Sequence, residues 1–290
     1  SRKILSMNIK RIPNEIYIRE NSRLANLYID LGQYKKAIQH DLNVVKAISD
    51  KDFDKRFDLL VQAKPAALSS LALSYAETGN IKKSRECFEQ AYHFFEKSDD
   101  YFTRIYILVY LANSLIIQDK NQEASKLLKT AHEYCETIRA VLLKPYVLSA
   151  LGIALGRIGK SEEGLKLCKK ALTLAASSKL VLRTSQFKIW HAEMLMIHGN
   201  YSLAIRNLEK IIKLTLSCNE MRSFASAYYL LGRCYLEKRG VTKNDLKYAE
   251  ICLDQALQIS QKFCMRTLEN RIQILFKRKL QSQKVKIFSE

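Results

Sequence analysis

The residue types that most often carry out chemistry are present, but few of them are spaced to act together. His191 and His198 lie two helical turns apart, about 10 Å along a helix, which is too far for both to bind one metal ion directly. His132 and Cys135 fall on one helix face, but two ligands do not complete a metal site. The sequence has no phosphate-binding glycine loop, no H-E-x-x-H motif and no nucleophile elbow. We therefore expect no enzymatic activity, no bound metal and no cofactor.

The seven cysteines contain no C-x-x-C pair, and most lie in apolar helical stretches, where a free thiol behaves as a small hydrophobic side chain. This usage predicts reduced thiols and a cytoplasmic protein, with the nucleus as the alternative. No signal peptide is visible. The longest apolar run, Ile105 to Ile117, is shorter than the ~20 residues of a membrane span, so we expect a buried helix and no transmembrane segment. The first residue is Ser1, and we allow for flanking domains beyond the sequence.

Small residues recur at a fixed spacing in the middle of apolar helical stretches. The first set is Ala25, Ala72, Ala112, Gly152, Ala192 and Gly232, spaced by 47 residues once and then by 40. A second set lies twelve residues further on, at Ala37, Ser84, Ala124, Gly164 and Ala204, and Ala249 follows an insertion in the sixth unit. Antiparallel helices pack closely only where a small side chain lets one backbone approach the other. With few glycines and prolines and 48% hydrophobic residues, the sequence predicts an all-α array of six helix pairs.

Glycines mark the turn expected inside four of the pairs, because glycine adopts without strain the left-handed conformation that ends a helix. They are Gly32, Gly79, Gly159 and Gly199, and Asp119 takes this place in the third pair. We expect one array over residues 18–261, after an N-terminal capping segment at 1–17. A C-terminal capping helix, at about 265–281, and a tail complete residues 262–290. Insertions at 49–64 and 238–243 are expected to interrupt the repeat.

The run Leu24-Ala25-x-x-Tyr28-x-x-Leu31-Gly32-x-Tyr34-x-x-Ala37 resembles a tetratricopeptide repeat, and the fifth unit has the same core at Gly199, Tyr201 and Ala204. The likeness covers about residues 18–261. The family's usual period is about 34 residues, so a period of 40 is similar to the long-repeat subgroup of kinesin light chains, LGN/Pins adaptors and MalT-like regulators. The resemblance implies a right-handed superhelical solenoid in which the first helix of each pair lines a concave groove.

The same resemblance implies a peptide-binding site on the first helices. The groove positions of the family correspond here to Arg19, Arg23, Asn26, Tyr106, Tyr110, Asn113, Tyr146, Trp190, Tyr229 and Arg233. Asn26 and Asn113 stand where the family often has an asparagine that binds a peptide backbone, since an amide offers both a donor and an acceptor. The aromatic residues would supply rigid contact area and the arginines would bind carboxylates. In the alternative interpretation, the aromatic side chains only pack between units and the arginines are solvated.

Further groove positions carry Arg157 and Glu193, and the second unit has Ala66, Ser69, Ser70 and Leu73 there. The clamp with which the family holds chaperone tails needs an asparagine in that unit, so this clamp is not present.

The balance of 48 Lys and Arg against 29 Asp and Glu gives a formal net charge of +19, which favours acidic partners. Basic residues form a stripe on the second helices, for example at Lys35, Lys82, Lys166 and Lys210. We interpret the stripe as a solvated face, and the alternative is a platform for nucleic acid or anionic lipid. No aromatic residues alternate with these lysines, which argues against base stacking.

Three functions of different classes fit the sequence. The first is a scaffold or adaptor that holds an acidic or extended segment of another protein, as a peptide or a helix, in the groove. The second is a ligand- or peptide-sensing module of a larger signalling or transcription regulator. The third is nucleic-acid binding through the basic surface, as in the interferon-induced tetratricopeptide proteins.

Overall fold

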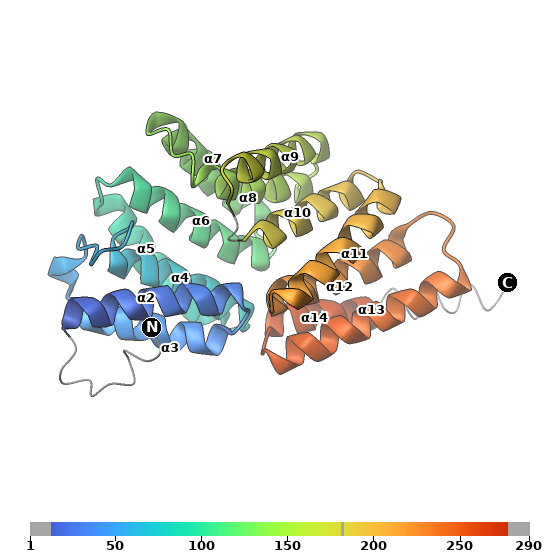
Figure 1. The fold of residues 1–290 in the computed structure, drawn as a ribbon, viewed down its shortest axis with the longest axis horizontal. Coiled ribbons are helices and arrows are strands. Elements are labelled where there is room, and N and C mark those ends of the chain that lie inside the picture. Colours follow the sequence, from blue (N-terminus) through green and yellow to red (C-terminus); the bar gives the residue numbers. More distant parts are fainter. Residues whose placement is uncertain (1–12, 181–182, 278–290) are drawn as a thin grey trace. The chain divides into compact units, whose positions relative to one another are not determined.

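The structure, a computed structural model, describes residues 13–180 and 183–277, and these residues form helices and loops without a strand. The helices, in chain order, are α2 (Asn14–Asp30), α3 (Tyr34–Ala47), the short 3-10 helix η2 (Asp50–Asp52), α4 (Ala63–Glu77), α5 (Ile81–Lys97), α6 (Tyr101–Ile117), α7 (Asn121–Thr137), α8 (Lys144–Arg157), α9 (Ser161–Ser177), α10 (Thr184–Ile197), α11 (Tyr201–Ser217), α12 (Met221–Glu237), α13 (Lys243–Lys262) and α14 (Arg266–Leu275) (Figure 1). The predicted all-α fold of helix pairs is confirmed.

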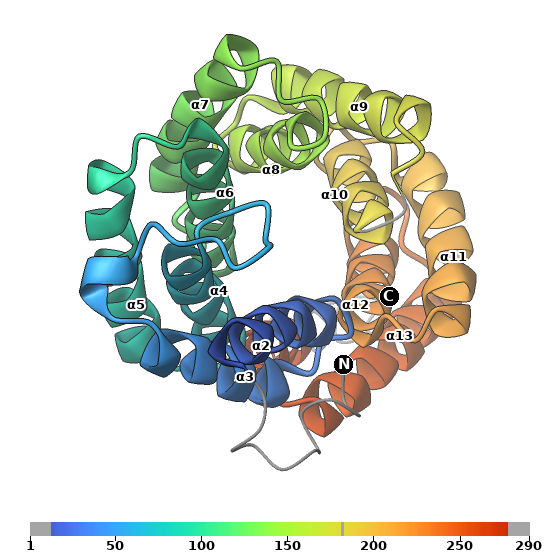
Figure 2. The same cartoon turned by 60° about the vertical axis from the view of Figure 1, so that its left-hand side comes forward.

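The helices form six successive pairs, from α2 and α3 to α12 and α13, followed by α14. Contacts divide the chain into two compact units, with the boundary between Val147 and Leu148 inside α8. In unit 1, α2, α4 and α6 form one layer, and α3, α5 and α7 form the other (Figure 2). In unit 2, α10 and α12 lie in one layer and α9, α11 and α13 in the other (Figure 2). We call these the first-helix layer and the second-helix layer of each unit.

The small residues lie where the two helices of a pair meet, as predicted. Both sets are buried in all six pairs. Helices α8 and α9 approach closely, since a Cβ added to Gly152 would lie 2.7 Å from the Gly164 carbonyl oxygen and 2.6 Å from Cys168 Sγ. In the second pair, Ser84 Oγ donates a hydrogen bond of 2.7 Å to the Ala72 carbonyl oxygen. Minimal side chains therefore set the distance between paired helices.

The turn between paired helices has the predicted left-handed residue. Gly32 has φ 71°, and Asp119, which replaces glycine in the third pair, has φ 61°. Aspartate tolerates this conformation better than most residues. The turn of the third pair therefore keeps its left-handed geometry although aspartate replaces the glycine there.

The first insertion interrupts the repeat, as expected; it is mostly loop, and α4 begins before Lys64. The Nζ of Lys64 donates a hydrogen bond of 2.7 Å to the Ile48 carbonyl oxygen and forms an ion pair of 2.5 Å with Asp50. In the second insertion, Gly240 has φ 66° and Thr242 begins α13 in a reciprocal capping box with Asp245. Specific polar contacts thus fix the conformation of both insertions.

Helices lie near both ends of the described residues. Helix α2 begins at Asn14, inside the segment predicted as an N-terminal cap, whose residues 1–12 lie outside the described residues. Helix α14 confirms an extra helix after the sixth pair, and the predicted residues 278–281 of that helix lie outside the described part. The single array over 18–261 stays a prediction.

The apolar run of α6 is a buried helix, as predicted. None of the helices in residues 13–180 and 183–277 combines the length and the apolar character that a bilayer crossing requires. All seven cysteines are free thiols, and four of them are buried: Cys135, Cys168, Cys234 and Cys252. The basic stripe on the second helices is exposed to solvent.

Candidate functional site

In unit 1, the structure brings three predicted site residues into direct contact. The hydroxyls of Tyr106 and Tyr110 on α6 both donate hydrogen bonds to Asn26 Oδ1 on α2, at 3.0 and 2.6 Å. The two tyrosine rings stack with their centroids 4.5 Å apart. Asn26 Nδ2 donates to the Ser22 carbonyl oxygen at 3.1 Å. The carboxamide of Asn26 is therefore engaged on both sides by its own chain, in an arrangement that we call the Asn26 contact.

Helix α4 lies between α2 and α6 and packs against both. Every residue of α4 is buried, including the groove positions Ala66, Ser69, Ser70 and Leu73. Ser70 Oγ donates a hydrogen bond of 2.6 Å to Asp41 Oδ2 on α3. Burial raises the pKa of Asp41 well above its usual value, although the hydrogen bond from Ser70 opposes this. The small side chains of α4 thus serve packing.

Asn113 on α6 differs from Asn26. Its Oδ1 atom is buried and accepts no hydrogen bond from any residue that the structure describes. The side chain as a whole is half-buried. A buried polar atom without a partner costs free energy, commonly ~1–3 kcal/mol, so its presence calls for an explanation. Of the two predicted backbone-binding asparagines, Asn113 is thus the one whose side-chain oxygen has no hydrogen-bond partner among the described residues.

The arginines of α2 already bind carboxylates of this chain. Arg19 lies 3.3 Å from Glu20 Oε1 and 2.8 Å from Asp58 Oδ2, and Arg23 lies 3.3 Å from the same Glu20 oxygen. Glu20 is buried, whereas the Arg23 side chain is 54% exposed. Tyr146, in the first part of α8, is half-buried. Arg19 and Arg23 are thus paired with carboxylates of this chain and remain partly exposed to solvent.

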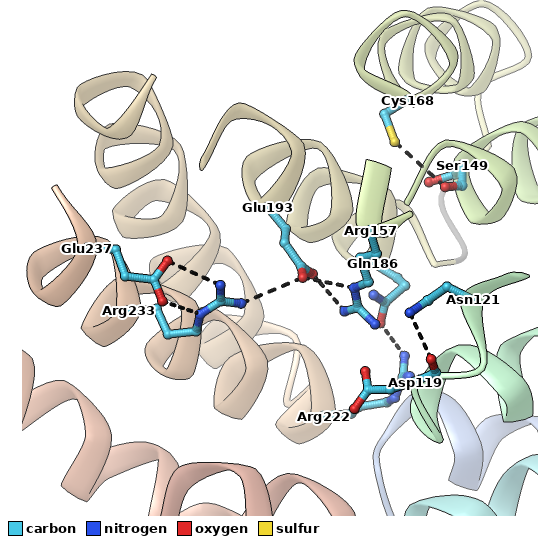
Figure 3. Close-up of polar contacts among 10 residues, drawn as sticks. All are labelled: Asp119, Asn121, Ser149, Arg157, Cys168, Gln186, Glu193, Arg222, Arg233 and Glu237. Atoms are coloured by element: carbon cyan, nitrogen blue, oxygen red, sulfur yellow. Dashed lines mark hydrogen bonds and ion pairs between the residues drawn. The ribbon is translucent and has the colours of Figure 1, made fainter. Parts of the chain in front are cut away.

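In unit 2, the first-helix layer carries a row of alternating charges. Glu193 on α10 accepts two hydrogen bonds from Arg157, each of 3.0 Å, and lies 3.8 Å from Arg233 Nη1 on α12. Arg233 also makes two bonds of 3.2 Å to Glu237. Figure 3 shows Glu193 between the two guanidinium groups, with Glu237 beyond Arg233. We call these four residues the charge row.

The charge row holds Glu193 ionised in a buried place. Burial by itself raises the pKa of Glu193, but the charge and hydrogen bonds of Arg157, followed by the charges of Arg233 and Arg271, outweigh it, so the pKa lies below its ordinary value. Burial likewise disfavours the charge of Arg233, but Glu193 and Glu237 raise its pKa overall. The row is a connected ionic network with two positive and two negative members.

The predicted aromatic residues of unit 2 are partly covered. Trp190 is 7% exposed, so it offers little contact area as it stands. Tyr229 is half-buried, and the Arg233 guanidinium lies 5.8 Å from its ring centroid. Beside the charge row, Arg222 donates a short hydrogen bond to Gln186 Oε1 (Figure 3). Across residues 13–180 and 183–277, no three His, Cys, Asp or Glu side chains gather as a metal site.

Sequence reasoning named three members of the charge row, Arg157, Glu193 and Arg233, but not Glu237 and not how the four residues pair. Arg157 and Glu193 are 36 residues apart, four fewer than the period, and so are Gln186 and Arg222. Complementary side chains 36 residues apart could have revealed these contacts. This spacing places the two residues one helical turn out of register in neighbouring units.

The comparisons with known proteins concern the repeat and the fold. The family model of the tetratricopeptide repeat matches residues 21–40 and 65–92, which cover much of the first two helix pairs. A search of curated protein sequences found no match.

Several solved structures are similar in fold. A Rap protein complexed with competence and sporulation factor has 15% identity and a TM-score of 0.60, over 94% of this chain and 78% of that chain. PlcR of Bacillus thuringiensis, in complex with the peptide PapR7 and DNA, has 12% identity and a TM-score of 0.56, over 82% of this chain and 83% of that chain. A signal-transduction ATPase with a tetratricopeptide repeat sensor from Pyrococcus horikoshii has 17% identity and a TM-score of 0.51, over 93% of this chain and 41% of that chain.

The repeat signature, the helix pairs with small residues at their contacts, and the left-handed turns all agree with the family match. The chain contains tetratricopeptide repeat sequence at residues 21–40 and 65–92, and its later helix pairs are packed in the same way.

Proposed function

We propose that this chain is a non-enzymatic binding module that takes a peptide or helix of a partner protein along its first-helix layers. The observation that carries the proposal is Asn113, whose buried carboxamide oxygen has no partner among the described residues. The last torsion of an asparagine is broad, so a rotation of the carboxamide can present this oxygen to a ligand. A peptide N–H would then satisfy it, and the amide nitrogen of Asn113 could donate to the adjacent peptide carbonyl.

Two further observations support this proposal. The fold is similar to that of PlcR, whose structure was determined with the peptide PapR7, although the low identity limits this comparison to the fold. In unit 2, polar groups of the charge row lie on three successive first helices, so a ligand along this layer would meet arginine on more than one of them. We therefore propose an extended or helical segment with acidic residues as the partner.

The test starts from affinity purification with the wild-type chain, followed by mass spectrometry, and the bound segment is then made as a synthetic peptide. We expect Asn113→Ala to weaken binding of this peptide by about tenfold, the value of one to two hydrogen bonds, in isothermal titration calorimetry. Asn121→Ala is the matched control, because Asn121 on α7 also has a buried oxygen without a partner but lies in the second-helix layer of the same pair.

The proposal fails if Asn113→Ala binds the peptide as the wild type does, or if Asn121→Ala loses as much affinity. A change in stability does not explain a selective loss, because removing an unsatisfied buried group by truncation costs little. Thermal unfolding of both variants therefore accompanies the titration.

A sensor module is the second candidate, and the Asn26 contact favours it. These hydrogen bonds join α2 and α6, which are 80 residues apart at this point, so a ligand that competes for Asn26 would loosen both helices together. Hydrogen exchange of the protein, measured with and without the bound peptide, would distinguish the two candidates. Faster exchange of α2 and α6 on binding supports a ligand-driven change, whereas unchanged or slower exchange supports a scaffold that binds without rearrangement.

A further inference from the structure

A hollow of about 330 Å³ lies in unit 2 where α9, α10 and α11 meet. Its apolar lining consists of Leu172 on α9 and of Ile211 and Leu214 on α11. Ile211 is buried in the core, whereas Leu214 is 36% exposed. Helix α10 packs against both α9 and α11, and the hollow is the space left where all three contribute side chains. Its volume is at the lower end of the range of ligand pockets, roughly 300–1,000 Å³.

The polar part of the lining is basic and contains no acidic residue. Lys188 and His191 come from α10, and Asn207 and Lys210 come from α11. Both lysines are exposed. Lys169 on α9 is close enough to His191 for its charge to act on the imidazole, and together with burial it lowers the pKa of His191. The hollow therefore combines an apolar interior with a rim of cations.

These cations are not neutralised by the chain itself. Within residues 13–180 and 183–277, Lys169, Lys188 and Lys210 form no ion pair. In the first-helix layer of the same unit, by contrast, Arg157 and Arg233 are both paired with glutamates. In unit 2, lysines without an ion pair thus lie around the hollow, whereas the arginines of the charge row share their charge with glutamates.

We propose that this hollow binds one large apolar side chain of an acidic segment of a partner protein, with Lys188 and Lys210 binding carboxylates on either side of it. The occupant is a segment rather than a compact anion, because exposed cations continue beyond the hollow along both helices. They include Lys170 on α9 and Arg206 on α11. The site lies in unit 2, whereas Asn113 lies in unit 1, and it does not depend on the proposed peptide-binding function.

The probe is a fluorescein-labelled hexapeptide with one Phe flanked by Asp and Glu, titrated by fluorescence anisotropy at about 0.1 M ionic strength, where distant charges are screened. Replacing the Phe of the probe by Ser should weaken binding by about tenfold, or about 1.4 kcal/mol, because the apolar contact is lost while the charge is kept. If both peptides bind equally, the hollow is not used and the proposal is overturned.

Charge reversal with a matched control tests the rim. Lys188→Glu with Lys210→Glu should weaken binding of the Phe peptide by about tenfold or more. Lys166→Glu with Lys213→Glu is the control, because these exposed lysines lie on α9 and α11 outside the lining and change the net charge by the same amount. The control should change affinity by less than about threefold. Equal losses in both variants would indicate binding to overall charge and would overturn the proposal.

A site-specific readout completes the experiment. In protein labelled with 15N-histidine, the Phe peptide should shift the signals of His191 and leave those of His40 and His93 in unit 1 unchanged. Asn113→Ala should not alter this response, so failure of this site and failure of the peptide-binding proposal can be told apart.

The wild type and the two lysine double variants are also titrated with single-stranded RNA and with anionic vesicles. A higher affinity for either, lost equally in both lysine variants, would assign the surface to nucleic acid or lipid instead and would overturn the proposal.

Discussion

Replacing Glu193 by glutamine removes the one negative charge that lies between Arg157 and Arg233. Glu193 is 4% exposed and accepts two hydrogen bonds of 3.0 Å from Arg157. The glutamine keeps the shape and one acceptor, but it leaves two guanidinium groups facing a neutral side chain. Breaking a buried ion pair from one side commonly costs about 3–5 kcal/mol. Because the arginine side chains are 17% and 23% exposed, water screens part of the effect and we expect a loss near the lower end, about 3 kcal/mol.

The loss is measured as the free energy of unfolding in urea at pH 7, and as a fall in Tm of roughly 6–12 °C for a unit of this size. Glu209→Gln is the control, since Glu209 on α11 is exposed and a surface substitution usually changes stability by less than about 0.5 kcal/mol. The double variant Arg157→Met with Glu193→Leu should recover more than half of the loss, because it removes both charges together.

The pH dependence of the free energy of unfolding tests independently whether ionised Glu193 stabilises the folded state. The folded-state pKa of Glu193 lies below its ordinary value of about 4.3. The stabilisation is therefore fully present above about pH 4.3 and is lost as the pH falls through the lower folded-state pKa. The difference between wild type and Glu193→Gln should be constant from pH 7 to about pH 5 and shrink below about pH 4. A loss below about 1 kcal/mol at pH 7, or a double variant as unstable as the single one, would refute this account of the charge row.

Two further predictions concern packing. Gly152→Ala should destabilise the chain by about 1–3 kcal/mol, because the new Cβ would meet the Gly164 carbonyl oxygen. Gly159→Ala, which has free space around it but a φ of 92°, should cost only about 1 kcal/mol in the same thermal unfolding assay; the reverse order would contradict the close contact of α8 and α9. Iodoacetamide at about pH 8 should label the exposed Cys218 long before Cys168, because burial raises the pKa of the Cys168 thiol to about 12. Mass spectrometry of the labelled peptides measures the order of labelling. Rapid labelling of Cys168 would show that the helix pair of α8 and α9 opens.

The helix pairs could be predicted from the sequence because packing imposes a local requirement. A small residue at the contact of two helices is needed in every pair, so Ala25, Gly152 and their counterparts recur at the repeat spacing. The turn is equally local, and its left-handed conformation persists at Asp119, where the glycine is missing. Periodicity and turn chemistry therefore identify the architecture without any knowledge of long-range contacts.

The polar contacts of the site could not be read in the same way. Asn26 is hydrogen-bonded to Tyr106 and Tyr110, which lie 80 and 84 positions further along the chain. The spacing of 36 residues that pairs Arg157 with Glu193 does not apply to these contacts. The meeting of these side chains depends on the position of α4 between α2 and α6, which depends in turn on the packing of all three helices. The family pattern places Asn26 on the correct layer but carries no information about the tyrosines that its side chain meets.

This difference decides which asparagine should govern ligand affinity. A ligand that binds Asn26 must replace hydrogen bonds of 2.6 and 3.0 Å from Tyr110 and Tyr106, so bonds gained are offset by bonds lost, and the two hydroxyls need new partners. A ligand that binds Asn113 replaces no bond between described residues at its oxygen, and it also removes the cost of an unsatisfied buried acceptor. If both asparagines contacted a peptide in the same way, the gain in binding free energy would still come mainly from Asn113. Equal losses of affinity for Asn26→Ala and Asn113→Ala would therefore mean that the Asn26 contact is already open in the protein that meets its ligand.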